Sequence, residues 1–153
     1  LYDSLSARYT KALARAMAYT KQVKAANSIN NGMPSGSFQS GDGVTLFNTS
    51  HPLVSGGTNS NTPSTASDLN DVNAIKNNGT IPEGYRVNHY LTDTNAWVIL
   101  TDVPNGLKHF ERAAMTTAMD GDFNTGNVRY KARERYSFGV SDPLGAFGSP
   151  GAS

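Results

Sequence analysis

The feature that most constrains the fold is a long run from Asp3 to Asn31 that contains neither Pro nor Gly. Asp3 is a good N-cap residue, as is Ser4, and Gly32 suits the position just past a helix end. At about 1.5 Å per residue, a helix over 4–31 would be roughly 40 Å long. Such a helix is longer than a small domain needs, so we predict that it is the backbone of an extended structure.

Two rows of side chains follow the helical spacing of three and four. One is a narrow, mainly apolar stripe of Leu5, Tyr9, Ala12, Leu13, Ala16, Thr20 and Val23. The other is a polar ridge of Arg8, Lys11 and Arg15. We interpret the stripe as core and the ridge as a candidate contact surface.

The segment from residue 33 to 70 is rich in Gly, Ser, Thr and Asn, with one apolar patch at 44–47. It reads as mostly loop, although its length is far above that of ordinary loops. With only 37% hydrophobic residues and 15 Gly, the chain can build only a thin core. We expect its stability to depend on burial against other subunits.

Beyond residue 71 the pattern indicates strands. Residues 85–91 alternate, 92–95 form a turn and 96–100 are apolar, which predicts one hairpin. A second hairpin runs from 110–119 through the turn-rich segment 120–127 into 128–140. The Gly- and Pro-rich residues 142–153 are predicted to be an extended tail.

The return strand of the second hairpin has two different faces. Glu134 interrupts an apolar face made of Val128, Tyr130, Ala132, Tyr136, Phe138 and Val140. The opposite face is a basic row of Arg129, Lys131, Arg133 and Arg135. Cations about 6.6–6.8 Å apart suit a polyanion or an acidic neighbour, the alternative being a solvated surface.

No catalytic or metal motif is evident. Ser50 and His51 are adjacent and point in different directions, and no Gly-x-Ser-x-Gly elbow accompanies them. The spacing of His51, His89 and His109 matches no short ligand motif. We therefore predict that the chain is not an enzyme and binds neither a metal nor a cofactor.

Calcium is the closest alternative, because acidic and amide residues alternate at Asp120, Asp122 and Asn124. A calcium loop needs Gly at its sixth position and a bidentate carboxylate at its twelfth. Here those positions are Thr125 and Lys131. We interpret the segment as a hairpin turn.

Composition excludes several broad classes. The net charge of +1 implies no global attraction to nucleic acid, and the chain has no Cys for disulfides or thiolate sites. No run is long and apolar enough to span a bilayer, so no membrane partner is expected.

Five short segments have distinctive sequences. They are GDGVTLFNTSHPL at 41–53, the LTD-x-x-AW stretch that begins at Leu91, DFNTGN at 122–127, YKARERYSFG at 130–139 and GSPGA at 148–152. All five resemble segments of the major head (capsid) proteins of Mu-like tailed bacteriophages. Each motif is short, but together they span nearly the whole chain.

The resemblance implies the α+β fold shared by tailed-phage and herpesvirus shells. That fold has a peripheral domain, with a long spine helix and long β-hairpins, and an axial domain. Residues 1–32 would be the spine helix, 33–70 an extended irregular segment, 71–105 a portion of the axial domain, and 106–153 peripheral strands and the tail. Family members are longer, so the start at Leu1 and the long loop suggest an incomplete chain with a gap near Asn70 and Asp71.

The function that the resemblance implies is self-assembly into an icosahedral head in the virion, with assembly in the cytoplasm of the host bacterium. The expected partners are other copies in pentamers and hexamers, decoration, scaffold or portal proteins, and packaged double-stranded DNA bound without sequence preference. The alternatives are a nanocompartment shell of the same fold and a secreted β-rich binding or hydrolytic module.

Overall fold

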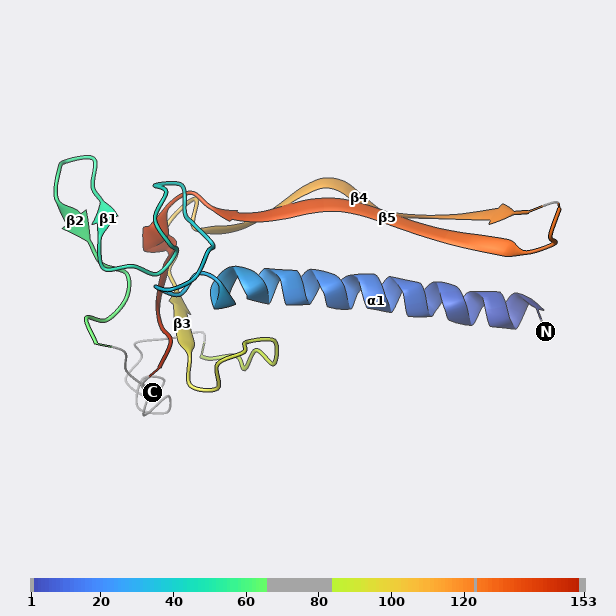
Figure 1. Cartoon of the computed structure of the whole chain (residues 1–153), viewed down its shortest axis with the longest axis horizontal. Coiled ribbons are helices and arrows are strands. Elements are labelled where there is room, and N and C mark those ends of the chain that lie inside the picture. Colours follow the sequence, from blue (N-terminus) through green and yellow to red (C-terminus); the bar gives the residue numbers. More distant parts are fainter. Residues whose placement is uncertain (1, 66–83, 123, 152–153) are drawn as a thin grey trace.

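A computed structural model describes residues 2–65, 84–122 and 124–151 of the chain. Helix α1 (Tyr2–Asn30) runs beside the long hairpin of β4 (Leu107–Gly121) and β5 (Val128–Val140) (Figure 1). The remaining elements gather at one end of this pair. We call residues 2–30 and 107–140 the arm, and the other described residues the head.

Helix α1 has 29 residues, which confirms the predicted helix to within two residues at each end. The predicted apolar stripe is partly wrong. Leu13 and Val23 are half-buried, but Tyr9 is 63% exposed. Three further members of the stripe are exposed, namely Ala12, Ala16 and Thr20. The side chain of Leu5 lies outside the described part. The reason is that a two-stranded ribbon covers only a narrow part of the helix surface.

The hairpin is antiparallel from Leu107 opposite Val140 to Gly121 opposite Val128. Two register shifts interrupt β4 between Glu111 and Thr116. Strand β5 alternates as predicted, with even-numbered residues from 130 to 138 half-buried and odd-numbered residues from 129 to 137 exposed. Val128 departs from this pattern because it lies at the tip and is 51% exposed. In β4 every residue from 108 to 121 is exposed.

The first predicted hairpin is wrong. Strand β3 (Trp97–Leu100) forms as expected, but residues 85–91 form no strand. The partner of β3 is β6 (Ala146–Ser149), paired antiparallel with Trp97 opposite Ser149. The tail is therefore not free, since it continues through η1 (Pro143–Gly145) into this buried strand.

Small residues explain why β6 can occupy this position. A Cβ on Gly148 would lie 2.9 Å from the Phe47 ring and 3.0 Å from the Trp97 carbonyl oxygen. Only glycine fits such a close approach without displacing its neighbours. The two strands therefore meet through a contact between distant parts of the sequence.

The core lies in the head, where Leu46, Phe47, Val140 and Ala146 are buried together. The apolar patch in the irregular segment thus supplies the centre of the core. Partly buried residues packed around it are Ile29, Met33, Phe38, Val98 and Leu107. The last residues of α1 and β5 enter this cluster, so the arm is anchored in the head.

Little regular structure surrounds the core. Within the described part of 33–70, the strands are β1 (His51–Pro52) and β2 (Thr58–Asn59), which pair with each other. Residues 66–83 lie outside the described part, and so do the suspected gap near Asn70 and Asp71 and the last residues of the segment predicted to be irregular. The division into peripheral and axial domains stays a prediction.

Candidate functional site

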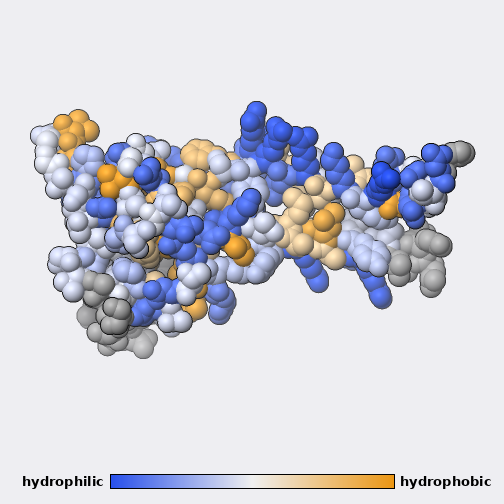
Figure 2. Space-filling model, in the orientation of Figure 1, coloured by the Kyte–Doolittle hydropathy of each residue, from blue (hydrophilic) through white to orange (hydrophobic). Residues whose placement is uncertain are grey.

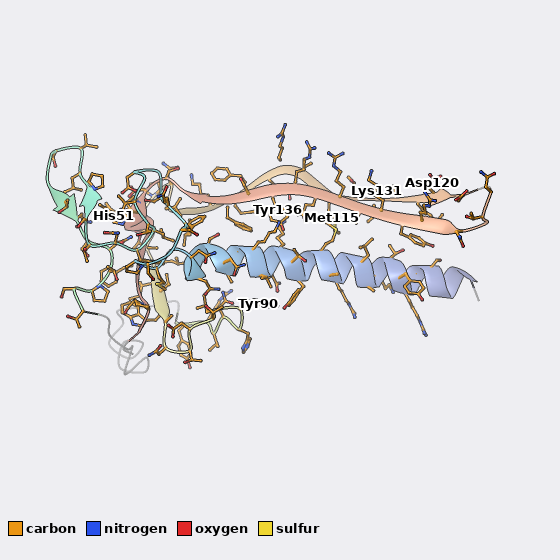
Figure 3. All side chains as sticks on the ribbon, in the orientation of Figure 1. His51, Tyr90, Met115, Asp120, Lys131 and Tyr136 are labelled. Carbon is orange, nitrogen blue, oxygen red and sulfur yellow. The ribbon has the colours of Figure 1, made fainter. Side chains whose placement is uncertain are left out.

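The basic row lies on the outer face of the arm. Arg129, Lys131, Arg133 and Arg135 are all exposed. Figure 3 shows Lys131 on the side of the hairpin that faces away from α1, whereas Tyr136 lies on the helix side. Hydrophilic side chains project from the same side of the arm in the space-filling view (Figure 2). The predicted two-faced strand therefore presents its cations to solvent.

One member of the row is engaged at the hairpin tip. Arg129 Nη2 lies 3.2 Å from Asp122 Oδ2, and Asp122 Oδ1 accepts a hydrogen bond from the Asn124 amide at 3.1 Å. This carboxylate thus shapes an Asx turn, as interpreted from the sequence. In the described part of the chain, the other three cations of the row form no ion pair.

The residues opposite those three cations on β4 are small and uncharged. Ala118 is opposite Lys131, Thr116 is opposite Arg133 and Ala113 is opposite Arg135. The positive charge of these three cations is therefore not neutralised by their cross-strand neighbours, whereas Arg129 lies opposite Asp120. The face is open to an anionic partner with a flat surface.

The inner face of the hairpin holds it to the helix. Lys21 Nζ lies 2.5 Å from Glu134 Oε1, and the Glu134 side chain is only 6% exposed. The hydrogen bond with Glu134 raises the pKa of Lys21 above its usual value despite the opposing effect of desolvation. The Glu134 that interrupts the apolar pattern of β5 is thus the ionic contact to α1.

Aromatic contacts extend this interface toward the head. The Nζ atoms of Lys21 and Lys24 lie 5.1 and 5.7 Å from the centre of the Tyr136 ring. Tyr136, Phe138 and His109 stack with ring centres 5.2–5.8 Å apart. His109 is therefore a packing residue of the arm.

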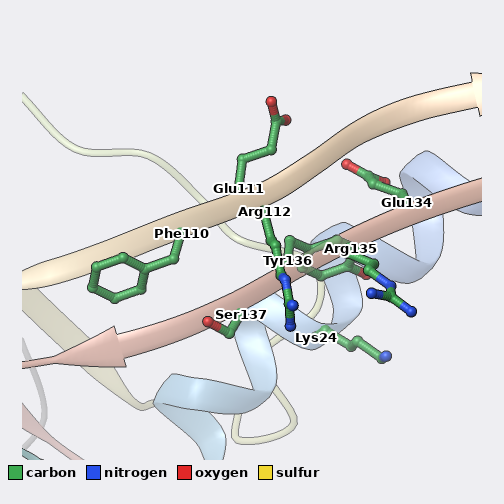
Figure 4. A pocket seen from close by; sticks show the side chains of 8 residues that line it. All are labelled: Lys24, Phe110, Glu111, Arg112, Glu134, Arg135, Tyr136 and Ser137. Atoms are coloured by element: carbon green, nitrogen blue, oxygen red, sulfur yellow. The ribbon is translucent and has the colours of Figure 1, made fainter.

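A shallow groove of about 510 Å³ opens beside this interface (Figure 4). The residues that line it are Lys24, Phe110, Glu111, Arg112, Glu134, Arg135, Tyr136 and Ser137. Its charges are mixed, and Glu134 already holds Lys21. The groove is part of the contact between helix and hairpin and offers no arranged nucleophile and base.

The predicted helix ridge is accessible but separate. Arg8, Lys11 and Arg15 are all exposed on α1. Among the residues that the structure describes, no ion pair involves them. Because the basic row lies on the side of the hairpin away from α1 (Figure 3), it does not face the helix that carries the ridge.

Sequence reasoning missed a buried polar junction in the head. His51 is 2% exposed, with Nδ1 2.5 Å from Asp42 Oδ2 and Nε2 3.1 Å from Asn61 Oδ1. Asp42 Oδ1 also accepts hydrogen bonds from the Ser40 hydroxyl and the Val44 amide. Burial acts to raise the pKa of Asp42, but its hydrogen bonds with Ser40, His51 and Val44 together hold it below the usual value.

Asn61 is the centre of this junction. Its Nδ2 donates to the carbonyl oxygens of Leu46 at 2.6 Å and Pro143 at 2.9 Å. Its Oδ1 accepts from the Asn48 amide at 2.8 Å and from His51. One buried amide thus joins the irregular segment to the segment that leads into β6.

The junction does not form a catalytic pair. Both ring nitrogens of His51 face Asp42 and Asn61, whereas Ser50 is exposed and its amide bonds to Asn48 Oδ1. His89 is exposed. No group of three or more His, Cys, Asp or Glu side chains suited to a metal ion occurs in the described ranges.

Comparison with known proteins gives no match to any family model, curated protein or solved structure. Among the described residues, no helix combines the length and apolarity needed to cross a membrane. Inferences about function therefore depend on the geometry of the arm and head.

Proposed function

We propose that this chain is a structural subunit of a bacteriophage icosahedral head. The observation that carries the proposal is the amount of surface left uncovered. The chain exposes 10835 Å², whereas a compact monomer of 16.3 kDa is expected to expose about 7,500 Å². The excess of about 3,300 Å² is comparable with the area buried in large obligate interfaces.

The arm is open along one strand, because every residue of β4 from 108 to 121 is exposed. Strand β4 has 15 residues and, among the strands that the structure describes, pairs only with β5, so its outer edge carries backbone groups with no partner strand there. A two-stranded ribbon is marginally stable in water and gains stability when further surface covers it. In the proposed particle, neighbouring subunits cover the arm.

The proposed assembly is one of pentamers and hexamers that tile a closed shell around double-stranded DNA. Contacts that join different surfaces of neighbouring copies close into rings by rotation. The basic row would serve either such a contact or the surface that faces the DNA. Decoration, scaffold or portal proteins would be further partners, and the virion would be the location.

Measuring particle formation tests the proposal. The full chain should form closed particles by analytical ultracentrifugation and negative-stain electron microscopy, because association covers the open arm. The variant Arg133→Glu/Arg135→Glu should stay soluble and helical by circular dichroism but form no particles. Arg86→Glu, which changes an exposed residue of the head, is the control and should assemble normally.

Three outcomes separate the alternatives. A compact monomer in dilute and concentrated solution contradicts the proposal and favours a binding or hydrolytic module. Particles that enclose protein cargo instead of DNA indicate a nanocompartment shell. Particles formed by the double variant show that Arg133 and Arg135 are not needed at subunit contacts.

A further inference from the structure

Charge is segregated between the arm and the rest of the chain. The arm contains eleven of the 13 Lys and Arg residues but only five of the 12 Asp and Glu residues, which gives it a net charge of +6. The other residues contain two basic and seven acidic side chains and have a net charge of −5. Within the described head, the acidic residues are Asp42, Asp93, Asp102 and Asp142 and the basic residue is Arg86, so the described arm and head carry net charges of opposite sign.

On the described surface of the head, acidic side chains are available while basic ones are scarce. Asp93 and Asp102 are exposed, and Arg86 is the one Lys or Arg in the head ranges that the structure describes. Asp93 Oδ1 accepts a hydrogen bond from the Asn95 amide, which fixes the turn that carries it. Asp42 and Asp142 are half-buried and hold internal hydrogen bonds.

On the outer face of the arm, by contrast, the exposed charged side chains are mainly basic. Lys131, Arg133 and Arg135 are exposed, form no ion pair within the described chain and face small neutral residues on β4. Figure 3 shows Lys131 well along the arm from the head, on the side away from α1. The row therefore lies on the side of the hairpin away from α1, whereas residues 84–95, the yellow-green segment in Figure 1, lie on the other side of α1.

We propose that the basic row of one copy binds the acidic head surface of a second copy, around Asp93 and Asp102. This inference rests on the proposed function and names the partner of the row. A second copy is favoured because each chain carries both complementary surfaces. Contact between two arms is disfavoured, because each carries a net charge of +6.

The geometry of such a contact matters for assembly. Joining an arm to a head uses different surfaces on the two copies, so each copy retains a free arm or head for the next. Complementary charge acts mainly on the encounter rate and on orientation. Because the Debye length is about 8 Å at physiological ionic strength, the contact should weaken as salt is raised.

A charge-exchange experiment on the full chain tests the proposal. The arm variant is Arg133→Glu/Arg135→Glu and the head variant is Asp93→Lys/Asp102→Lys. Each alone should form no particles at low salt under conditions where wild type assembles, as measured by light scattering. An equimolar mixture should recover assembly, because each variant then offers the charge that the other lacks.

The four-fold variant that combines both changes should also recover assembly by itself. Circular dichroism establishes that each variant is folded. Asp93→Asn/Asp102→Asn removes the charge without reversing it and should give an intermediate rate. Electron microscopy establishes that the recovered scattering comes from particles of wild-type size.

The outcomes separate this inference from the proposed function. Failure of the wild-type chain to assemble overturns both. Wild-type assembly without recovery in the mixture or the four-fold variant overturns the arm-to-head contact alone. An arm variant that assembles at the wild-type rate but no longer binds a short DNA duplex assigns the row to nucleic acid, and this also overturns the contact.

Discussion

Replacing Asn61 with Ala should cost the head a large part of its stability. The side chain is 2% exposed and makes four hydrogen bonds, two as donor and two as acceptor. At about 1 kcal/mol net for each bond, the variant should lose about 4 kcal/mol. The loss arises because the Leu46 and Pro143 carbonyl oxygens stay buried without this donor.

The expected change in melting temperature follows from chain length. For 153 residues, each kcal/mol corresponds to about 2–4 °C, so Asn61→Ala should melt about 8–16 °C below wild type. Thermal unfolding is followed by circular dichroism in dilute, particle-free solution. Asn59→Ala, a change of the same type at a half-exposed site in β2, is the matched control.

An isosteric variant tests whether the amide nitrogen of Asn61 is needed as a donor. Asn61→Asp places a second acceptor against the Leu46 and Pro143 carbonyl oxygens, so it should destabilise the head at least as much as Ala. Melting of Asn61→Ala within about 2 °C of Asn59→Ala would refute the reasoning. A wild-type melting temperature for Asn61→Asp would show that the donor is not needed.

Two further changes probe the rest of the head. Gly145→Ala should destabilise the chain by about 2–3 kcal/mol in thermal unfolding, because its Cβ would overlap the Gly106 Cα, whereas Gly121→Ala adds a methyl group in open space and should be neutral. Asp42→Asn should lower stability at neutral pH. Because the pKa of Asp42 is lowered from 3.8, its stabilisation is present above that value and lost as the pH falls through the folded-state pKa. The stability difference between wild type and Asp42→Asn should thus shrink as the pH falls below about 3.8, and a difference that stays unchanged from pH 5 down to pH 2 would contradict this assignment.

Local patterns predicted the elements whose partners are close in sequence. The helix over 4–31 and the alternation of β5 follow from spacing alone, and both appear in the structure. The apolar run that includes Trp97 and Ile99 correctly indicated a strand. Its predicted partner was wrong because the strand that pairs with it, β6, lies far along the chain, where Gly148 supplies the small residue that fits beside it.

The polar junction could not be read from the sequence. Asn61 belongs to a segment rich in Ser, Thr and Asn, where nothing distinguishes a buried amide from an exposed one. Asp42 and His51 are nine residues apart and meet only because the chain folds around Leu46 and Phe47. The basic row, in contrast, could be predicted because a strand alternates its faces without help from tertiary structure.

The two register shifts in β4 limit how the open edge of the arm can be used. Pairing with β5 is regular up to Glu111 and again from Thr116, with only Ala113 matched between them. Extra residues at such shifts bend a strand, and β4 arches away from β5 near the middle of the arm (Figure 1). A straight strand laid along this edge would lose its hydrogen bonds at the arch, so the subunit discourages stacking of arms into fibres.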